Sequence, residues 1–173
     1  MKGIWKKIIE VDLTAGNAVA KELPESFYLK YLGGLGLASR LLLDYTEKGI
    51  DPLSEKNVLV IAPGLLVGTG LPTASKTTLT FKSPETNAFG RSVSGAFLGA
   101  ALKKAGFDAM VIKGKSNKPV YLVIDDEKFT IKDASGLWGK DTLETQEILQ
   151  KELGNDFRTA AIGPAGEKLL RIA

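Results

Sequence analysis

The sequence predicts an α+β fold made of two similar β-rich halves, each a hairpin followed by a helix and a strand, related by a pseudo-two-fold axis. Alternating or β-branched segments outnumber helical ones and arrive as hairpins, which favours α+β over a parallel βαβ arrangement. The order hairpin, helix and apolar strand ending in a glycine–proline type turn occurs near the N-terminus and again in the C-terminal third. Coincidence is the alternative, because such short units are common.

The N-terminal half is predicted from hydrophobic periodicity and turn residues. Apolar residues alternate in its hairpin, recur at approximately helical spacing in its helix and run continuously in its last strand. We expect strands over 4–12 and 18–23 with a turn at 14–17, a helix over 27–48 and a strand over 57–62. Gly33, Gly34 and Gly36 interrupt the helical pattern, so the helix can break there.

The remaining elements follow from the same signals. We expect a strand over 76–82, a loop over 83–87, a helix over 95–106, a strand over 109–113, hairpin strands over 120–125 and 128–132, a helix over 141–153 and a strand over 158–162. Asp141, with Glu144 three residues later, is typical of a helix N-terminus. Gly154 is typical of a helix C-terminus.

The composition argues against several classes of function. The 173 residues suit one domain with a core, and 23 basic and 20 acidic residues leave a net charge of +3. This mild, dispersed charge without an aromatic–basic stripe argues against a nucleic-acid partner. No apolar run is long enough for a membrane span, and the first seven residues lack a signal-peptide core, so we expect a cytoplasmic protein. A lysine-rich chain without cysteine or histidine is typical of a thermophile.

The absence of cysteine and histidine limits the chemistry most. Without thiols or imidazoles the chain cannot ligate an iron–sulfur cluster, a haem or a typical zinc ion, and it has no Ser–His or Cys–His pair. Its glycine-rich turns are nevertheless of the kind that hold a cofactor. Any chemistry should therefore belong to a bound cofactor or to residues on another part of a longer polypeptide.

One candidate turn is segment 70–77, Gly-Leu-Pro-Thr-Ala-Ser-Lys-Thr. It resembles a phosphate loop with serine in place of the second glycine, in which backbone amides and Lys76 would surround phosphate oxygens. Such a loop should lead into a helix, whereas 77–82 has the pattern of a strand, and Pro72 removes one donor. We therefore favour a lysine that faces some other phosphate or anion.

A second candidate turn is Val93-Ser94-Gly95, directly before a predicted helix. Helix N-termini bind anions through free amides, and Gly95 would let a ligand approach the backbone. Simple capping of the helix by Ser94 is the alternative.

A series of short blocks runs through nearly the whole chain. They include Trp5 with Val11-Asp12-Leu13-Thr14, Gly33-Gly34 with Gly36-Leu37-Ala38, Asp51-Pro52-Leu53-Ser54, Pro63-Gly64, Lys82-Ser83-Pro84, Ser94-Gly95 with Gly99, Leu137-Trp138-Gly139-Lys140 and Ile162-Gly163-Pro164-Ala165-Gly166-Glu167. Singly these blocks are weak signals. In this order and spacing, the chain resembles the N-terminal domain of the tungsten-containing aldehyde ferredoxin oxidoreductase family.

The resemblance implies a domain of two similar β-rich halves that forms a base for two pterin dithiolenes. In this family the pterins chelate one tungsten or, in some members, molybdenum. The resemblance also implies oxidation of aldehydes to carboxylic acids, with electrons passing through a [4Fe–4S] cluster to ferredoxin. Such enzymes are oxygen-sensitive and anaerobic.

Two positions carry over as cofactor-binding residues. Lys76 would lie between cluster and pterin; the family often has arginine there, so the charge is kept while the forked donor geometry is lost. The turn Val93-Ser94-Gly95 would touch the pterin. Family members often have asparagine at the position of Val93, and valine leaves only backbone contact there. No catalytic or metal-ligating residue is expected in this chain.

The family's cluster cysteines and substrate-channel residues lie beyond this length, and the chain ends on an apolar, strand-like run at 169–173. We therefore expect residues 1–173 to be the N-terminal cofactor-base domain of a longer oxidoreductase, truncated at its C-terminus and inactive alone. An exposed apolar face, where the other domains pack, would let the isolated chain self-associate as a homo-oligomer. The alternative is a stand-alone anion- or pterin-binding or assembly module without catalytic activity.

Overall fold

The computed structural model describes residues 3–172. Met1 and Lys2, which open the stretch without a signal-peptide core, and Ala173, which ends the apolar run, lie outside the described residues. The elements in chain order are β1 (Lys7–Asp12), β2 (Asn17–Glu22), α1 (Glu25–Tyr31), α2 (Leu35–Tyr45), β3 (Leu59–Pro63), β4 (Thr77–Lys82), β5 (Phe89–Ser94), α3 (Leu98–Lys104), β6 (Ala109–Lys113), β7 (Val120–Asp125), β8 (Lys128–Asp133), α4 (Thr142–Leu153) and α5 (Pro164–Glu167). The predicted α+β class is confirmed.

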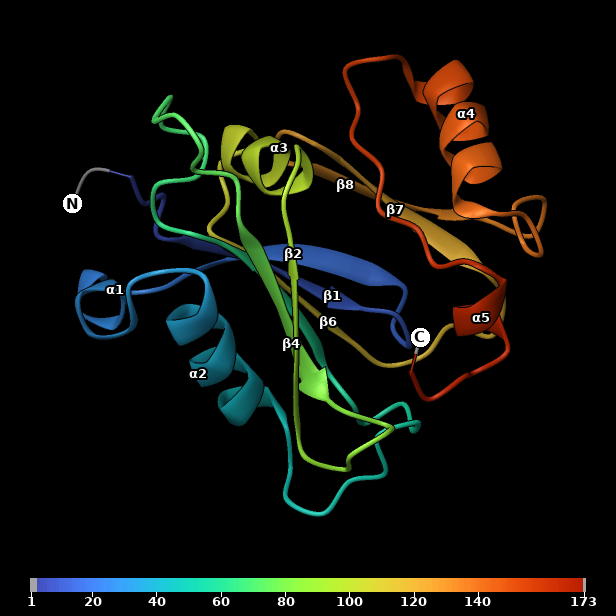
Figure 1. Cartoon of the computed structure of the whole chain (residues 1–173), viewed down its shortest axis with the longest axis horizontal. Coiled ribbons are helices and arrows are strands. Elements are labelled where there is room, and N and C mark those ends of the chain that lie inside the picture. The colour runs from blue at the N-terminus through green and yellow to red at the C-terminus, as the bar shows by residue number, and fades with distance from the viewer. Residues whose placement is uncertain (1–2, 173) are drawn as a thin grey trace.

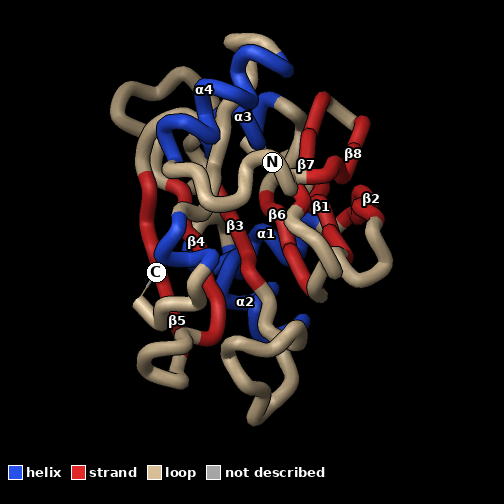
Figure 2. The backbone as a smooth tube through the Cα atoms, turned by 90° about the vertical axis from the view of Figure 1, so that its right-hand side faces the viewer, coloured by secondary structure: helices blue, strands red, loops and turns tan. Residues whose placement is uncertain are grey.

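Six strands form one mixed sheet in the order β2-β1-β6-β3-β4-β5, and β7 and β8 form a separate two-stranded sheet. Figure 2 shows the six strands side by side, with β5 at one edge and β2 at the other. Only the β1–β6 pair is parallel among these neighbours; the other pairs are antiparallel. Hairpins therefore build most of the sheet, as the alternating segments predicted.

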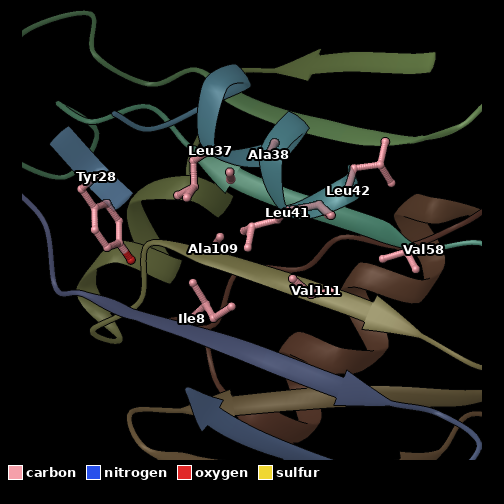
Figure 3. Close-up of a cluster of buried hydrophobic side chains, with 11 residues drawn as sticks. Ile8, Tyr28, Leu37, Ala38, Leu41, Leu42, Val58, Ala109 and Val111 are labelled. Carbon is pink, nitrogen blue, oxygen red and sulfur yellow. The ribbon is translucent and has the colours of Figure 1, made fainter. Parts of the chain in front are cut away.

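Helix α2 covers one face of the large sheet. Its side chains Leu37 and Leu41 are buried against Ile8 and Val111 from the neighbouring strands β1 and β6 (Figure 3). The alternation of β1 sends Ile9 to the opposite face, where it joins a second core cluster. The β7–β8 hairpin packs on that second cluster, which also contains Leu102 of α3, so α1 and α2 lie on one side of the sheet and α3 and the hairpin on the other (Figure 1).

The helix predicted over 27–48 is two helices, α1 and α2. The chain path between the two helices requires glycine at position 36, because a Cβ built on Gly36 would lie 2.3 Å from the carbonyl oxygen of Tyr31. Leu32 adopts φ 59° and Gly34 φ 53°, conformations that no continuous helix contains. The glycines thus mark the break, and close packing of the chain around Gly36 is the reason for it.

One strand prediction is wrong and one strand was missed. Residues 158–162 and the described part of 169–173 form no strand, because no neighbouring strand in the described residues pairs with them. No element was predicted over 88–92 and Val93-Ser94 was expected to be a turn, whereas Phe89–Ser94 is strand β5, which pairs antiparallel with β4. Thr77–Lys82 is confirmed as a strand, which excludes a phosphate-loop nucleotide site at 70–77.

The C-terminal unit contains the predicted hairpin, β7–β8, and the predicted helix, α4, without a following strand. Asp141 caps α4 as expected, since its carboxylate accepts hydrogen bonds from the amides of Leu143 and Glu144 at 2.9 and 2.8 Å. A glutamate–lysine–tyrosine group fastens the helix to its hairpin: Glu152 accepts from Lys132 and from the hydroxyl of Tyr121. In the described part of the chain, no helix combines the length and apolarity needed to cross a bilayer.

Candidate functional site

The four residues singled out in the sequence meet at one end of the β4–β5 hairpin. Lys76 directly precedes β4, and Val93 and Ser94 are the last residues of β5. Gly95 follows them, beside Lys76: a Cβ built on Gly95 would lie 4.0 Å from the Lys76 Nζ. The antiparallel register that pairs Thr77 with Ser94 creates this neighbourhood. Two segments that the sequence treated separately are therefore one site.

Gly95 is not required by the packing of this chain. A Cβ at Gly99 would lie 2.0 Å from Thr77 Oγ1 and one at Gly90 would lie 2.5 Å from the Phe81 ring, so those glycines are structural. At Gly95 the nearest atoms, Ser75 Oγ and Lys76 Nζ, are at ordinary contact distances of 3.8 and 4.0 Å. Because Gly95 carries no side chain, its backbone is accessible to a ligand or to a side chain from beyond the described residues.

The turn after Gly95 contains a strained residue. Ala96 has φ 61°, in the left-handed region that costs an L-residue about 1–2 kcal/mol. Residues held in such conformations concentrate at ligand clamps and active sites, where the surrounding structure maintains the strain. The left-handed conformation of Ala96 is thus a separate observation that is consistent with a ligand-binding turn at residues 93–96.

The side chains of Val93 and Ser94 point to opposite faces of the sheet. Val93 pairs with Thr78 and Ser94 with Thr77, and neighbouring strand residues alternate in direction. Thr80, on the face of Thr78, donates a hydrogen bond to the Ala38 carbonyl of α2, while Thr77 packs on Gly99 of α3. A ligand on one face can therefore touch only one of these side chains, and the backbone at the strand end is the surface that both faces share.

Ser94 does not cap the helix, so that alternative is wrong. The helix α3 begins at Leu98, three residues later than predicted, and its N-cap residue Phe97 makes no side-chain capping bond. The Ser94 hydroxyl donates instead to the adjacent Gly95 carbonyl at 3.3 Å. The hydroxyl is exposed and available to a ligand on the α3 side of the sheet.

Lys76 is an unneutralised cation. In the described part of the chain its ammonium group has neither an ion pair nor a hydrogen bond, and its side chain is exposed. Its backbone is fixed, because the Lys76 carbonyl accepts a hydrogen bond of 2.9 Å from the Gly64 amide. A positive charge on an anchored backbone beside open amides is suited to an anionic ligand.

A buried ion pair fixes the far end of α3. Asp108, 2% exposed, binds the Lys103 ammonium and accepts from the amides of Trp5 and Lys6 at 2.9 and 2.8 Å. Burial and, secondly, the Asp108 carboxylate raise the pKa of the nearby Tyr28 hydroxyl. Lys103 also donates to the Gly3 carbonyl at 2.9 Å, so the N-terminal segment and α3 are held as one unit.

Two surface hollows lie away from the candidate site. One of about 470 Å³ lies between the loops at 49–53 and 82–87, and one of about 500 Å³ lies between Trp5, Gly68 and Lys104. None of the four predicted site residues lines either hollow. The candidate site is an open strand end, a shape that suits a surface on which a large ligand rests.

The sequence analysis missed Phe97 and Arg158. The guanidinium of Arg158 lies over the Phe97 ring, 5.4 Å from its centroid, directly beside the Ser94–Gly95 turn. No local signal could have shown this, because the contact joins two distant segments and residues 158–162 were assigned to a strand.

Comparison with known proteins gives consistent matches over the whole chain. The family model for the aldehyde ferredoxin oxidoreductase N-terminal domain matches residues 8–173. Tungsten-containing aldehyde ferredoxin oxidoreductases of Pyrococcus furiosus and Thermococcus kodakarensis are each 44% identical over 174 aligned positions, covering 100% of this chain and 29% of theirs. The WOR-like subunit of an aliphatic sulfonate oxidoreductase from P. furiosus is 36% identical over 96% of this chain. The chain thus spans under a third of the length of these relatives.

A solved structure supports the same relationship. The active-site complex BamBC of benzoyl coenzyme A reductase, determined with 1,5-dienoyl-CoA, has a chain that is 40% identical. It superposes with a TM-score of 0.91 over 95% of this chain and 25% of its own length. The fold is therefore that of an oxidoreductase domain. The chain belongs to the aldehyde ferredoxin oxidoreductase family and corresponds to its N-terminal domain.

Proposed function

We propose that this chain is the cofactor-base domain of a longer tungsten-dependent enzyme that oxidises aldehydes to carboxylic acids. The observation that carries the proposal is the meeting of the unpaired Lys76 ammonium with the open backbone of Gly95. Relatives at 44% identity are tungsten-containing aldehyde ferredoxin oxidoreductases, which supports tungsten as the metal, with molybdenum as the alternative.

The residues of the site fit a pterin-type ligand and do not fit an iron–sulfur cluster. The bare Gly95 backbone and the Lys76 charge suit a large anionic group. A [4Fe–4S] cluster needs cysteine ligands, and the chain has none. Among the described residues no three histidine, cysteine, aspartate or glutamate side chains are grouped to hold a metal ion. In our proposal the metal is held by bis-pterin dithiolenes, and the cluster is ligated outside this chain.

The bound metal centre would supply the two-electron oxidation of the aldehyde, with water as the source of the added oxygen. The residues of this chain would bind and orient the cofactor. Lys76 would balance its negative charge, and the amides of the Ser94–Gly95 turn would donate to it. The exposed Val93 side chain would offer only apolar contact, so its backbone would carry any polar contact at this position. This chain would contribute no proton-transfer group to the reaction.

The proposal includes partners beyond these residues. Four large apolar side chains at the C-terminal end, Ile162, Leu169, Leu170 and Ile172, are 53–84% exposed and would pack against further domains of a longer cytoplasmic protein. The same face would account for self-association of the isolated chain. Ferredoxin would accept the electrons. The pseudo-two-fold relation is part of the proposal: β7, β8 and α4 would form the second half, completed by residues beyond this chain.

The first test is the composition of the protein purified anaerobically from its native source. We expect a polypeptide far heavier than 18.5 kDa that contains tungsten or molybdenum, iron and pterin. A mass near 18.5 kDa without metal or pterin would support the alternative, a stand-alone anion-binding or assembly module.

The second test addresses Lys76 in that full polypeptide. Lys76→Met should lower the pterin and tungsten content, and Lys76→Arg should retain it, because arginine keeps the charge. Lys104→Met is the matched control, since Lys104 is an exposed lysine on α3 away from the turn. Equal cofactor content in all three variants would refute the role of Lys76.

A further inference from the structure

The exposed aromatic ring of Phe97, the N-cap residue of α3, lies beside the candidate site. Phe97 is 67% exposed, although an apolar ring of this size is usually buried in a core. It follows Gly95 by two residues, with the strained Ala96 between them. The turn therefore presents a flat apolar surface to the outside at the end of β5.

Arg158 covers part of this ring. Its guanidinium lies 5.4 Å from the ring centroid, and the chain segment after α4 brings it there past α3 (Figure 1). One guanidinium nitrogen, Nη1, donates to the backbone carbonyls of Asn155 at 2.6 Å and Phe157 at 3.1 Å. The side chain is thus anchored, while its remaining N–H donors have no partner in the described residues.

Folding alone gives little reason for this arrangement. An exposed cation–π contact contributes about 0.5–1 kcal/mol. No carboxylate among residues 3–172 pairs with Arg158, so its charge is unneutralised. An anchored arginine with free donors is instead suited to bind a carboxylate or phosphate through two parallel N–H···O bonds.

We infer that Arg158 and Phe97 form a second arm of the candidate site that binds a phosphate-type oxyanion of the ligand. The inference rests on the proposed function and extends it. Lys76 lies beside Gly95, and Arg158 lies over the ring of Phe97, two residues further along the chain. The Ser94 hydroxyl faces the α3 side and, by turning from its long hydrogen bond to the Gly95 carbonyl, would donate to the same oxyanion. The ring of Phe97 holds the guanidinium plane and offers its uncovered face to a flat ligand.

The test uses inorganic phosphate as the probe and the cofactor-free form of the full native polypeptide. Isothermal titration at constant ionic strength compares the wild type with Arg158→Gln, Arg158→Lys, Phe97→Leu and Lys76→Met. Arg171→Gln is the matched control, because Arg171 is an exposed arginine that lines the distant hollow near Asn87. Pterin and tungsten content of the loaded variants gives a second readout.

We expect Arg158→Gln to weaken phosphate binding about tenfold, the effect of one lost charge-assisted contact at an exposed site. Arg158→Lys should recover only part of the affinity, because the fork is lost, and Phe97→Leu should weaken binding less than Arg158→Gln. Arg171→Gln should bind as the wild type does.

Two results would overturn the inference. Unchanged phosphate affinity in Arg158→Gln, with a loss in Lys76→Met, would remove the second arm and leave the proposed site at Lys76 intact. No phosphate binding by the wild type would also reject the arm, whereas the metal and pterin content of the native protein would still decide the proposed function separately.

Discussion

Removing one member of the buried Lys103–Asp108 pair should strongly destabilise the domain. Lys103→Met leaves the Asp108 carboxylate, 2% exposed, with the backbone amides of Trp5 and Lys6 as its hydrogen-bond donors among the described residues. Breaking a buried ion pair by removing one partner costs about 3–5 kcal/mol. Because two donors remain on the carboxylate, we expect a cost of about 3 kcal/mol for Lys103→Met.

Asp108→Ala should cost more than Lys103→Met. It leaves the buried Lys103 ammonium without its carboxylate, with the Gly3 carbonyl as its remaining acceptor in the described residues. It also removes the acceptor of the partly buried Trp5 and Lys6 amides, which adds up to about 1–3 kcal/mol for each amide. The total is at least about 5 kcal/mol, comparable to the whole stability of a typical domain, about 5–15 kcal/mol. Asp108→Asn should be intermediate, since its amide oxygen can still accept one of these bonds.

Urea unfolding followed by circular dichroism measures these costs, and amide hydrogen exchange at Trp5 and Lys6 reports whether the N-terminal segment is released. Lys104→Met is the control and should change the free energy of unfolding by less than about 0.5 kcal/mol, because Lys104 is exposed. A cost below about 1 kcal/mol for both Lys103→Met and Asp108→Ala would refute the reasoning, since such a pair would contribute no more than a surface salt bridge.

Three further outcomes follow from single sites. Gly99→Ala should lower the free energy of unfolding in urea by about 1–3 kcal/mol, because its Cβ would lie 2.0 Å from Thr77 Oγ1. Adding Thr77→Ala should recover part of this loss, and additive costs of the two substitutions would contradict the clash. Burial raises the pKa of Glu10, but hydrogen bonds from Lys113 and a tyrosine hydroxyl outweigh it and lower the pKa overall. Glu10 therefore stabilises the fold above the unfolded-state pKa of about 4.3, and the difference from Glu10→Gln should shrink as pH falls below that value; a constant difference from pH 7 to 3 would refute this. Ala96→Gly should stabilise by up to about 1 kcal/mol by relieving a left-handed alanine, and a large loss of stability would show that the conformation is not strained.

Local patterns were sufficient for several elements. Both hairpins, the helix capped by Asp141 and the strand Thr77–Lys82 depend on residues close together in the chain, so their alternation and turn chemistry were readable. The edge strand Phe89–Ser94 was missed because its glycine and two serines give a weak strand signal. Pairing with β4 makes it a strand, and that pairing is set by the loop between them.

The sequence by itself determined the fold class, the family and the absence of thiol and imidazole chemistry, because each depends on residue types and their order. Only the tertiary structure decided that Lys76 lies beside Gly95, that Val93 and Ser94 face opposite sides of the sheet and that Arg158 covers Phe97. These facts come from strand register and from the path of the segment after α4. Register and path are set by packing between distant segments, which no local pattern of residues encodes.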